Sequence, residues 1–193
     1  MEFTVPKTVS TLNIDREKEF FRVNILGVGV SAINMPQAVS IMESWVRSSQ
    51  SKYVCISSVH GLIESLRSEK VRQVHNEAGL VTPDGMPLVW LCRLFGNRNV
   101  SRVYGPDLVL EICKISPRKG YKHFFYGAAE GVADQLARQL QEWYPGLQVV
   151  GTFSPPYRPL TPEEDEYVVN MINEANPDFV WVSLSLPQAE LWM

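Results

Sequence analysis

Short apolar segments alternate along the chain with longer segments in which apolar residues recur every three or four positions. A short continuous apolar run is typical of a strand buried in a parallel sheet, and the longer spacing is typical of a helix with one buried face. The predicted strands cover residues 53–57, 79–81, 123–126, 147–150 and 179–183. The predicted helices cover residues 35–48, 62–77, 87–95, 108–114, 132–143 and 162–176, and another begins at Pro187.

The segment before residue 35 has a different pattern. Residues 21–26 alternate between polar and apolar side chains, Gly27 and Gly29 interrupt them, and residues 28–33 return as a second strand of a hairpin. Residues 1–20 are predicted to form a loosely held arm. Because strands and helices alternate from residue 35 onward, residues 21–193 are predicted to form a single α/β domain. Its fold would be a mostly parallel sheet with helices on both faces, plus a small N-terminal β-hairpin.

Each predicted strand after the hairpin ends in small or polar residues. In a parallel sheet these carboxyl ends share one edge, which is where ligands bind in open α/β folds. We therefore expect one crevice lined by the residues that end these strands, namely Ser57, Ser58, Thr82, Asp84, Gly127, Gly151, Thr152 and Ser183.

The turn Thr82-Pro83-Asp84-Gly85 holds the main candidate for chemistry. Pro presets its backbone angle, Asp bonds its own backbone readily and Gly tolerates positive φ, while Pro87 suits the first turn of a helix. This places the Asp84 carboxylate after a strand and before a helix. The alternative is that Asp84 only forms the turn or caps the helix.

Other residues carry weaker signals. The glycine turn 127–131 enters a helix and could present N–H groups to a phosphate, but it lacks a complete dinucleotide or P-loop pattern and could be a plain turn. Arg102 is either a surface arginine or, if it faces the crevice, a ligand for a diphosphate. We expect Asp107 to be the N-cap of its helix and His60 to be a satisfied histidine at a helix start. Core or half-buried packing is expected for Trp45, Trp90, Trp143 and Trp181.

Composition narrows the class of protein. The chain has 193 residues, of which 45% are hydrophobic and 20% charged, as in an ordinary globular protein. Its net charge of −3 gives no general attraction to nucleic acid or anionic lipid. The three cysteines and three histidines lack zinc-ligand spacing, so buried free thiols and no metal site are expected. Residues 1–19 lack the apolar core of a signal peptide, which favours a cytoplasmic location.

An ordered set of motifs resembles one known family, the WecG/TagA/CpsF family of bacterial glycosyltransferases. The resemblance covers about residues 20–193 and rests on Val81-Thr82-Pro83-Asp84-Gly85-Met86-Pro87, Arg102-Val103-Tyr104-Gly105-Pro106-Asp107, Gly151-Thr152-Phe153-Ser154-Pro155-Pro156, Ile172-Asn173, Asn176-Pro177-Asp178, and Pro187 with Glu190 and Trp192.

The resemblance implies a Rossmann-like fold and an inverting, metal-independent glycosyltransferase without a cofactor. Such an enzyme moves a sugar such as N-acetylmannosamine from a UDP-sugar to a polyprenyl-diphosphate-linked acceptor in cell-envelope polysaccharide synthesis. Asp84 would be the general base and Arg102 would lie at the donor or leaving group. Substrate binding is expected at Ser58, Thr82, Gly85, Arg102, Gly105, Asp107, Gly127, Gly151, Pro187, Gln188 and Glu190.

Three positions depart from the family pattern. Ile56 and Ser58 stand where the family has Thr and Asn, and Ala189 stands where it has Gln. These slots are expected to line the sugar pocket, where a missing amide removes hydrogen bonds. A nucleotide-sugar-binding protein without turnover is therefore an alternative. A Rossmann-type oxidoreductase is a second one, although the chain lacks the glycine fingerprint with its acidic partner.

The resemblance also implies a tail beyond Met193 that the sequence does not contain. In the family this tail carries basic residues and an apolar face that complete the site and touch the membrane. We therefore expect residues 1–193 to fold but to have low activity, and the full-length protein to lie on the inner face of the plasma membrane. A homo-oligomer is left open, and no nucleic-acid partner is expected.

Overall fold

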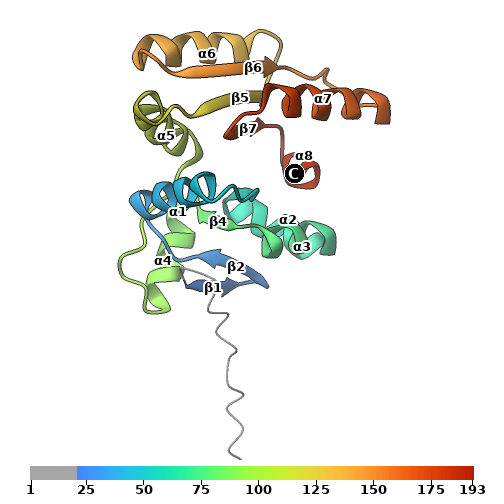
Figure 1. Cartoon of the computed structure of the whole chain (residues 1–193). Coiled ribbons are helices and arrows are strands. Elements are labelled where there is room, and N and C mark those ends of the chain that lie inside the picture. Colours follow the sequence, from blue (N-terminus) through green and yellow to red (C-terminus); the bar gives the residue numbers. More distant parts are fainter. Residues whose placement is uncertain (1–20) are drawn as a thin grey trace, which may run out of the picture.

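The computed structural model describes residues 21–193, and Figure 1 shows their arrangement. The predicted arm, residues 1–20, lies outside the described residues. The strands are β1 (Arg22–Ile25), β2 (Val28–Ser31), β3 (Val54–Ser57), β4 (Leu80–Pro83), β5 (Lys122–Gly127), β6 (Gln148–Phe153) and β7 (Phe179–Ser183). The helices are α1 (Met35–Arg47), α2 (Val59–Arg67), α3 (Glu69–Glu77), α4 (Met86–Leu94), α5 (Gly105–Lys119), α6 (Val132–Trp143), α7 (Pro162–Ala175) and α8 (Gln188–Trp192).

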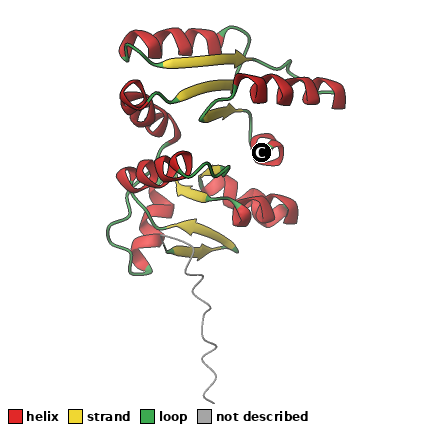
Figure 2. Ribbon diagram, viewed as in Figure 1, coloured by secondary structure: helices red, strands yellow, loops and turns green. Residues whose placement is uncertain are grey.

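The strands form three small sheets. β1 and β2 make the predicted antiparallel hairpin, β3 pairs with β4 in parallel, and β5 lies between β6 and β7 in a three-stranded parallel sheet. Helices lie beside the strands of both parallel sheets (Figure 2). The predicted α/β class and hairpin are confirmed. The strands nevertheless divide between two parallel sheets, because no backbone ladder joins the β3–β4 pair to the β5–β7 group within residues 21–193.

Side chains join the two parallel sheets where backbone pairing does not. One buried cluster combines Leu80 of β4 with Ile41 of α1, Ile112 of α5 and Phe179 of β7. A second cluster packs the hairpin against α4 through Leu88, Val89 and Cys92. Burial of each such side chain contributes about 1.5–3 kcal/mol, so these clusters hold the sheets in a defined relation.

Local sequence signals start most helices where predicted. Asn34 accepts a hydrogen bond from the backbone N–H of Gln37 (3.1 Å), and the Gln37 side chain accepts one from the backbone N–H of Asn34 (3.0 Å), which completes a capping box at α1. Thr161 and Glu164 form the equivalent box at α7. The starting points of these helices are therefore set by hydrogen bonds between residues close together in sequence.

Two predicted helices differ in extent from those observed. The segment expected as one helix to Glu77 is two helices, because Ser68 is extended and its hydroxyl accepts from the N–H of Val71 (3.4 Å) to cap α3. The helix expected at 108–114 is the longer α5, which begins at Gly105 with Pro106 in its first turn and includes Pro117.

Helical spacing puts Val132, Leu136 and Leu140 on one apolar face of α6, and only part of that face is buried. Leu140 is buried, but Leu136 and Val132 are 42% and 45% exposed, whereas Ala133 and Ala137 face the core. Small side chains at these positions allow α6 to lie closely against β5 and β6. Two tryptophans depart from the prediction in the same way, since Trp90 is 60% exposed and Trp143 58% exposed.

A buried histidine links α5 to the second parallel sheet. His123 on β5 is fully buried, accepts a hydrogen bond from Trp181 Nε1 at Nδ1 (3.0 Å) and lies 2.8 Å from Ser116 Oγ at Nε2. The rings of His123, Phe179 and Trp181 are stacked. Burial lowers the pKa of His123 from 6.5 to about 4, because the charged imidazolium loses its hydration.

This shift predicts a pH dependence of stability. The unfolded chain binds a proton at His123 near pH 6.5 while the folded chain does so only near pH 4, so the free energy of unfolding should fall as pH decreases through this interval. The loss at this site is up to about 3 kcal/mol.

Urea unfolding at several pH values would measure this loss. His123→Gln should flatten the acidic limb, and His60→Gln should not, because the His60 side chain is 64% exposed. An identical acidic limb in wild type and His123→Gln would contradict the assignment.

Candidate active site

The turn after β4 fixes the position of Asp84. All four residues of β4 are buried, and the backbone N–H of Asp84 donates to the carbonyl of Ser57 on β3 (2.9 Å), one residue beyond the paired strands. Gly85 has φ 128°, a conformation that other residues rarely adopt. Gly85 is also the N-cap of α4, and no side chain caps that helix. Asp84 therefore forms the turn but does not cap α4.

Arg102 faces Asp84 across this turn. Its Nε donates to Asp84 Oδ1 (3.2 Å), and its guanidinium lies 4.2 Å above the centre of the Tyr104 ring. The Asp84 side chain is 20% exposed and that of Arg102 47% exposed, so the pair opens to solvent. The two residues are 18 positions apart in sequence. Of the two positions considered for Arg102, the open surface or the crevice at the strand ends, the structure places it beside Asp84 at the end of β4.

The backbone around Arg102 is tied to the end of β4. Val103 N–H donates to the carbonyl of Pro83 (3.1 Å), and the buried Thr82 hydroxyl donates to the carbonyl of Val103 (3.4 Å). Gly105 begins α5 beside Ile56, so two of the candidate motifs meet at the β3–β4 edge. Asp107 was expected as the N-cap of α5, but Tyr104 occupies that position and Asp107 is an exposed residue of the first turn.

Ser57 and Ser58 end the neighbouring strand. Ser58 is the N-cap of α2, but its hydroxyl makes no capping bond. Ser57 is fully buried and its hydroxyl lies 3.3 Å from His75 Nε2, whose Nδ1 lies 2.9 Å from the carbonyl of Val71. Sequence reasoning missed this Ser57–His75 contact, because His75 had no signal beyond helical spacing. The His75 ring thus contacts the side chain of Ser57, and the carbonyl of the same Ser57 accepts the hydrogen bond from Asp84.

The C-terminal motif lies beside α3, near the β3–β4 sheet. Pro187 is the N-cap of α8, Gln188 is its exposed first residue, and Glu190 is only 5% exposed. Burial, together with the nearby Glu190 carboxylate, raises the pKa of the Cys55 thiol on β3 to about 12. Within residues 21–193, Glu190 Oε2 has no hydrogen-bond partner. A buried carboxylate oxygen without a donor is costly, so this atom is a candidate acceptor for a polar ligand.

Gly127 and Gly151 are held in the other parallel sheet, where packing explains both. A Cβ on Gly127 would lie 2.6 Å from the carbonyl carbon of Ser183, and Gly127 has φ 117°. A Cβ on Gly151 would lie 2.7 Å from Phe124 Cδ2. Gly151 was expected at the end of its strand, but it lies within β6, two residues before Phe153. Steric crowding alone is therefore a sufficient reason for glycine at both positions, so neither glycine is by itself evidence for a ligand.

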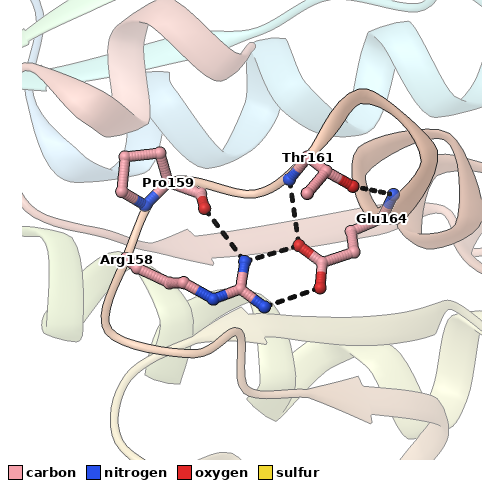
Figure 3. A network of polar contacts seen from close by, with 4 residues as sticks. All are labelled: Arg158, Pro159, Thr161 and Glu164. Carbon is pink, nitrogen blue, oxygen red and sulfur yellow. Dashed lines mark hydrogen bonds and ion pairs between the residues drawn. The ribbon is translucent and has the colours of Figure 1, made fainter.

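The loop before α7 holds another arginine, Arg158, whose charge is neutralised by a carboxylate. Arg158 makes a double hydrogen bond to Glu164 (2.6 and 2.7 Å), and Glu164 also accepts from the backbone N–H of Thr161 (2.9 Å), as Figure 3 shows. The hydrogen bonds from Arg158 and from the backbone of Thr161 lower the pKa of Glu164 to about 2. Arg158 therefore stabilises the start of α7, and Arg102 is the better placed of the two for an anionic ligand.

A groove of about 250 Å³ lies beside this loop, away from Asp84. Its walls are mostly apolar, from Phe153, Leu160 and Val168, and its charged groups are the carboxylates of Glu163 and Glu164. An apolar groove with acidic groups does not suit a diphosphate. Among residues 21–193 there is also no cluster of three or more His, Cys, Asp or Glu side chains that could hold a metal.

Comparison with known proteins adds a family to this geometry. Residues 23–193 match the sequence profile described as the Glycosyl transferase WecG/TagA/CpsF family. The chain belongs to this family. The match spans both parallel sheets and includes Asp84, Arg102 and Glu190.

Curated relatives share limited sequence identity with the chain. A protein of Bacillus subtilis (strain 168) is 27% identical over 165 residues, which is 81% of this chain and 62% of the relative. One from Bacillus spizizenii is 28% identical over 130 residues, or 67% of this chain and 49% of the relative. One from Staphylococcus aureus (strain NCTC 8325 / PS 47) is 24% identical over 184 residues, or 94% of this chain and 70% of the relative.

All three are named N-acetylglucosaminyldiphosphoundecaprenol N-acetyl-beta-D-mannosaminyltransferase. The matched part of this chain spans about half to two thirds of the length of the two Bacillus relatives.

The steric account of Gly127 predicts a strong effect of one methyl group. Gly127→Ala should destabilise the protein by at least about 2 kcal/mol, since the positive φ and the collision with Ser183 both add cost. Gly131→Ala is the matched control, because Gly131 has φ 77° but a Cβ there meets nothing within 4 Å. Thermal melts of both variants test this. Equal melting temperatures would show that the collision is absent.

Proposed function

We propose that this chain is an inverting glycosyltransferase that moves an N-acetylmannosamine-like sugar from a UDP-sugar to a polyprenyl-diphosphate-linked acceptor. The observation that carries the proposal is the Asp84–Arg102 pair at the end of β4, in a chain of the WecG/TagA/CpsF family. The names of the Bacillus and Staphylococcus relatives support the sugar and the lipid-linked acceptor. The UDP donor follows from the family resemblance.

The proposed chemistry assigns one proton transfer to Asp84. Arg102 Nε orients the carboxylate through Oδ1, and no described residue donates a hydrogen bond to Oδ2. In the reaction Oδ2 takes the proton of the acceptor hydroxyl as the acceptor oxygen bonds to C1 of the donor sugar. The bond between C1 and the UDP oxygen breaks, and UDP leaves with its electron pair. Attack from the face opposite UDP inverts C1.

Arg102 has a second role in this proposal. A guanidinium carries five N–H donors, and the contact with Asp84 uses only the Nε donor. The remaining donors can bind the diphosphate and stabilise the charge that grows on leaving UDP. Stacking on Tyr104 holds the guanidinium plane in place. Glu190 Oε2 is proposed to accept a hydrogen bond from a hydroxyl group of the donor sugar or of the acceptor.

Asp84→Asn should reduce turnover by roughly 10²–10⁴-fold, the range expected when a general base is lost. Folding and UDP-sugar affinity should change little, because Asn keeps the size and the backbone N–H. UDP release from the full-length protein is the measurement. Glu174→Gln, an exposed carboxylate on α7, is the control. Wild-type turnover in Asp84→Asn would rule out the role.

Donor binding should not need a divalent metal. Arg102 and backbone N–H groups at helix starts can supply the positive charge that a metal supplies elsewhere. Calorimetric titration with UDP-N-acetylmannosamine in EDTA should give the same affinity as in Mg²⁺ or Mn²⁺. An affinity that collapses in EDTA and returns with either ion would contradict this part of the proposal.

A nucleotide-sugar-binding protein without turnover is the second candidate. The apolar Ile56 and the small Ser58 stand at the β3 end where the family pattern has hydroxyl and amide groups, and Ile56 lies beside Gly105. Calorimetric binding of the UDP-sugar with no UDP release by the full-length protein would favour this candidate.

A further inference from the structure

Helix α4 exposes an apolar face at the surface. Leu88, Val89 and Cys92 point into the hairpin core, whereas Trp90 is 60% exposed, Leu94 78% and Phe95, at the end of the helix, 60%. Met86 and Leu91 add to the same exposed surface. Surface helices normally turn polar residues to solvent, and exposed apolar patches mark interaction sites. We call Met86, Trp90, Leu91, Leu94 and Phe95 the α4 face.

Positive charge accompanies the α4 face. Residues 85–106 contain three arginines and no aspartate or glutamate, although the whole chain has a net charge of −3. Arg102 is engaged with Asp84, which leaves Arg93 and Arg98, both exposed, near the end of the helix. Arg93 Nε donates to the carbonyl of Val100 (2.9 Å), so its guanidinium is held at this end. The local charge is therefore opposite to the average charge.

We propose that the α4 face docks on the surface of an anionic lipid bilayer. Trp90, Leu94 and Phe95 enter the boundary between headgroups and acyl chains, and Arg93 and Arg98 bind lipid phosphates. Aromatic and leucine side chains beside arginines are the features of helices that lie in a membrane interface. No helix of residues 21–193 is long and apolar enough to cross a membrane.

Charge favours a lipid surface over a second copy of the chain. A symmetric contact through the α4 face would bring Arg93 and Arg98 of two copies close together, and residues 85–106 offer no carboxylate to pair with them. An anionic bilayer supplies the opposite charge. The surface also lies within residues 21–193, apart from the tail to which the family resemblance assigns membrane contact.

The position of α4 gives docking a consequence, which rests on the proposed function. Asp84 lies two residues before the first residue of α4, so a docked helix holds the proposed base near the surface that carries a polyprenyl-linked acceptor. Membrane attachment itself does not depend on that function.

Vesicle sedimentation of residues 1–193 without substrates tests the proposal. The protein should bind vesicles that contain phosphatidylglycerol more tightly than vesicles of phosphatidylcholine alone. Trp90→Ser with Leu94→Ser should weaken binding at least about tenfold, since both apolar anchors are lost. Arg93→Gln and Arg98→Gln should each weaken binding to phosphatidylglycerol vesicles about fivefold. Circular dichroism and thermal melts check that each variant is folded.

Leu136→Ser with Trp143→Ser is the matched control, because these α6 residues are 42% and 58% exposed. Its vesicle affinity should equal that of the wild type. Equal weakening by the α4 and α6 variants, or no wild-type binding to phosphatidylglycerol vesicles, would overturn the proposal. So would a wild-type dimer that Trp90→Ser with Leu94→Ser converts to a monomer without changing vesicle affinity. Vesicle binding without UDP transfer would instead count against the proposed function alone.

Discussion

The hydrogen bond from the N–H of Asp84 to the carbonyl of Ser57 is the contact on which the candidate site depends. It extends the parallel pairing of β3 and β4 by one residue, so the turn begins in a fixed direction. Gly85 then takes a positive φ and α4 starts at once. As a result the Asp84 carboxylate stands at the sheet edge, where Arg102 reaches it.

Two buried side chains lie behind this edge. His75 Nε2 lies 3.3 Å from the Ser57 hydroxyl, and the carboxylate of Glu190 on α8 is near enough to Cys55, on the same strand, to raise the pKa of its thiol. The second is informative because β7 and α8 come from the opposite end of the chain. A C-terminal segment thus lies near a strand that precedes it by more than a hundred residues in sequence.

The arginines of the molecule differ in whether a carboxylate neutralises their charge. Arg158 is satisfied by Glu164, whereas Arg102 shares a carboxylate that is itself proposed to react. The arginines at the end of α4 face solvent beside exposed apolar side chains. An average charge of −3 conceals this local arrangement, because attraction to a charged surface depends on the nearest groups within a Debye length.

The sequence by itself determined the features that depend on neighbours a few residues apart. Asn34 and Thr161 start α1 and α7 through their capping boxes, and short apolar runs form the buried strands. The Thr82–Gly85 turn places a carboxylate at the end of a strand. Each depends on propensities and hydrogen bonds within one turn of chain, which a sequence displays directly.

Tertiary structure alone decided which side chains meet. It divided the strands between two parallel sheets, paired Arg102 with Asp84, buried Glu190 near Cys55, and turned Ala133 rather than Leu136 inward on α6. It also left Trp90 exposed on a helix that is apolar on nearly every side. These outcomes depend on the shape and area of partner surfaces far away in sequence, and such partners are chosen only when the whole chain packs.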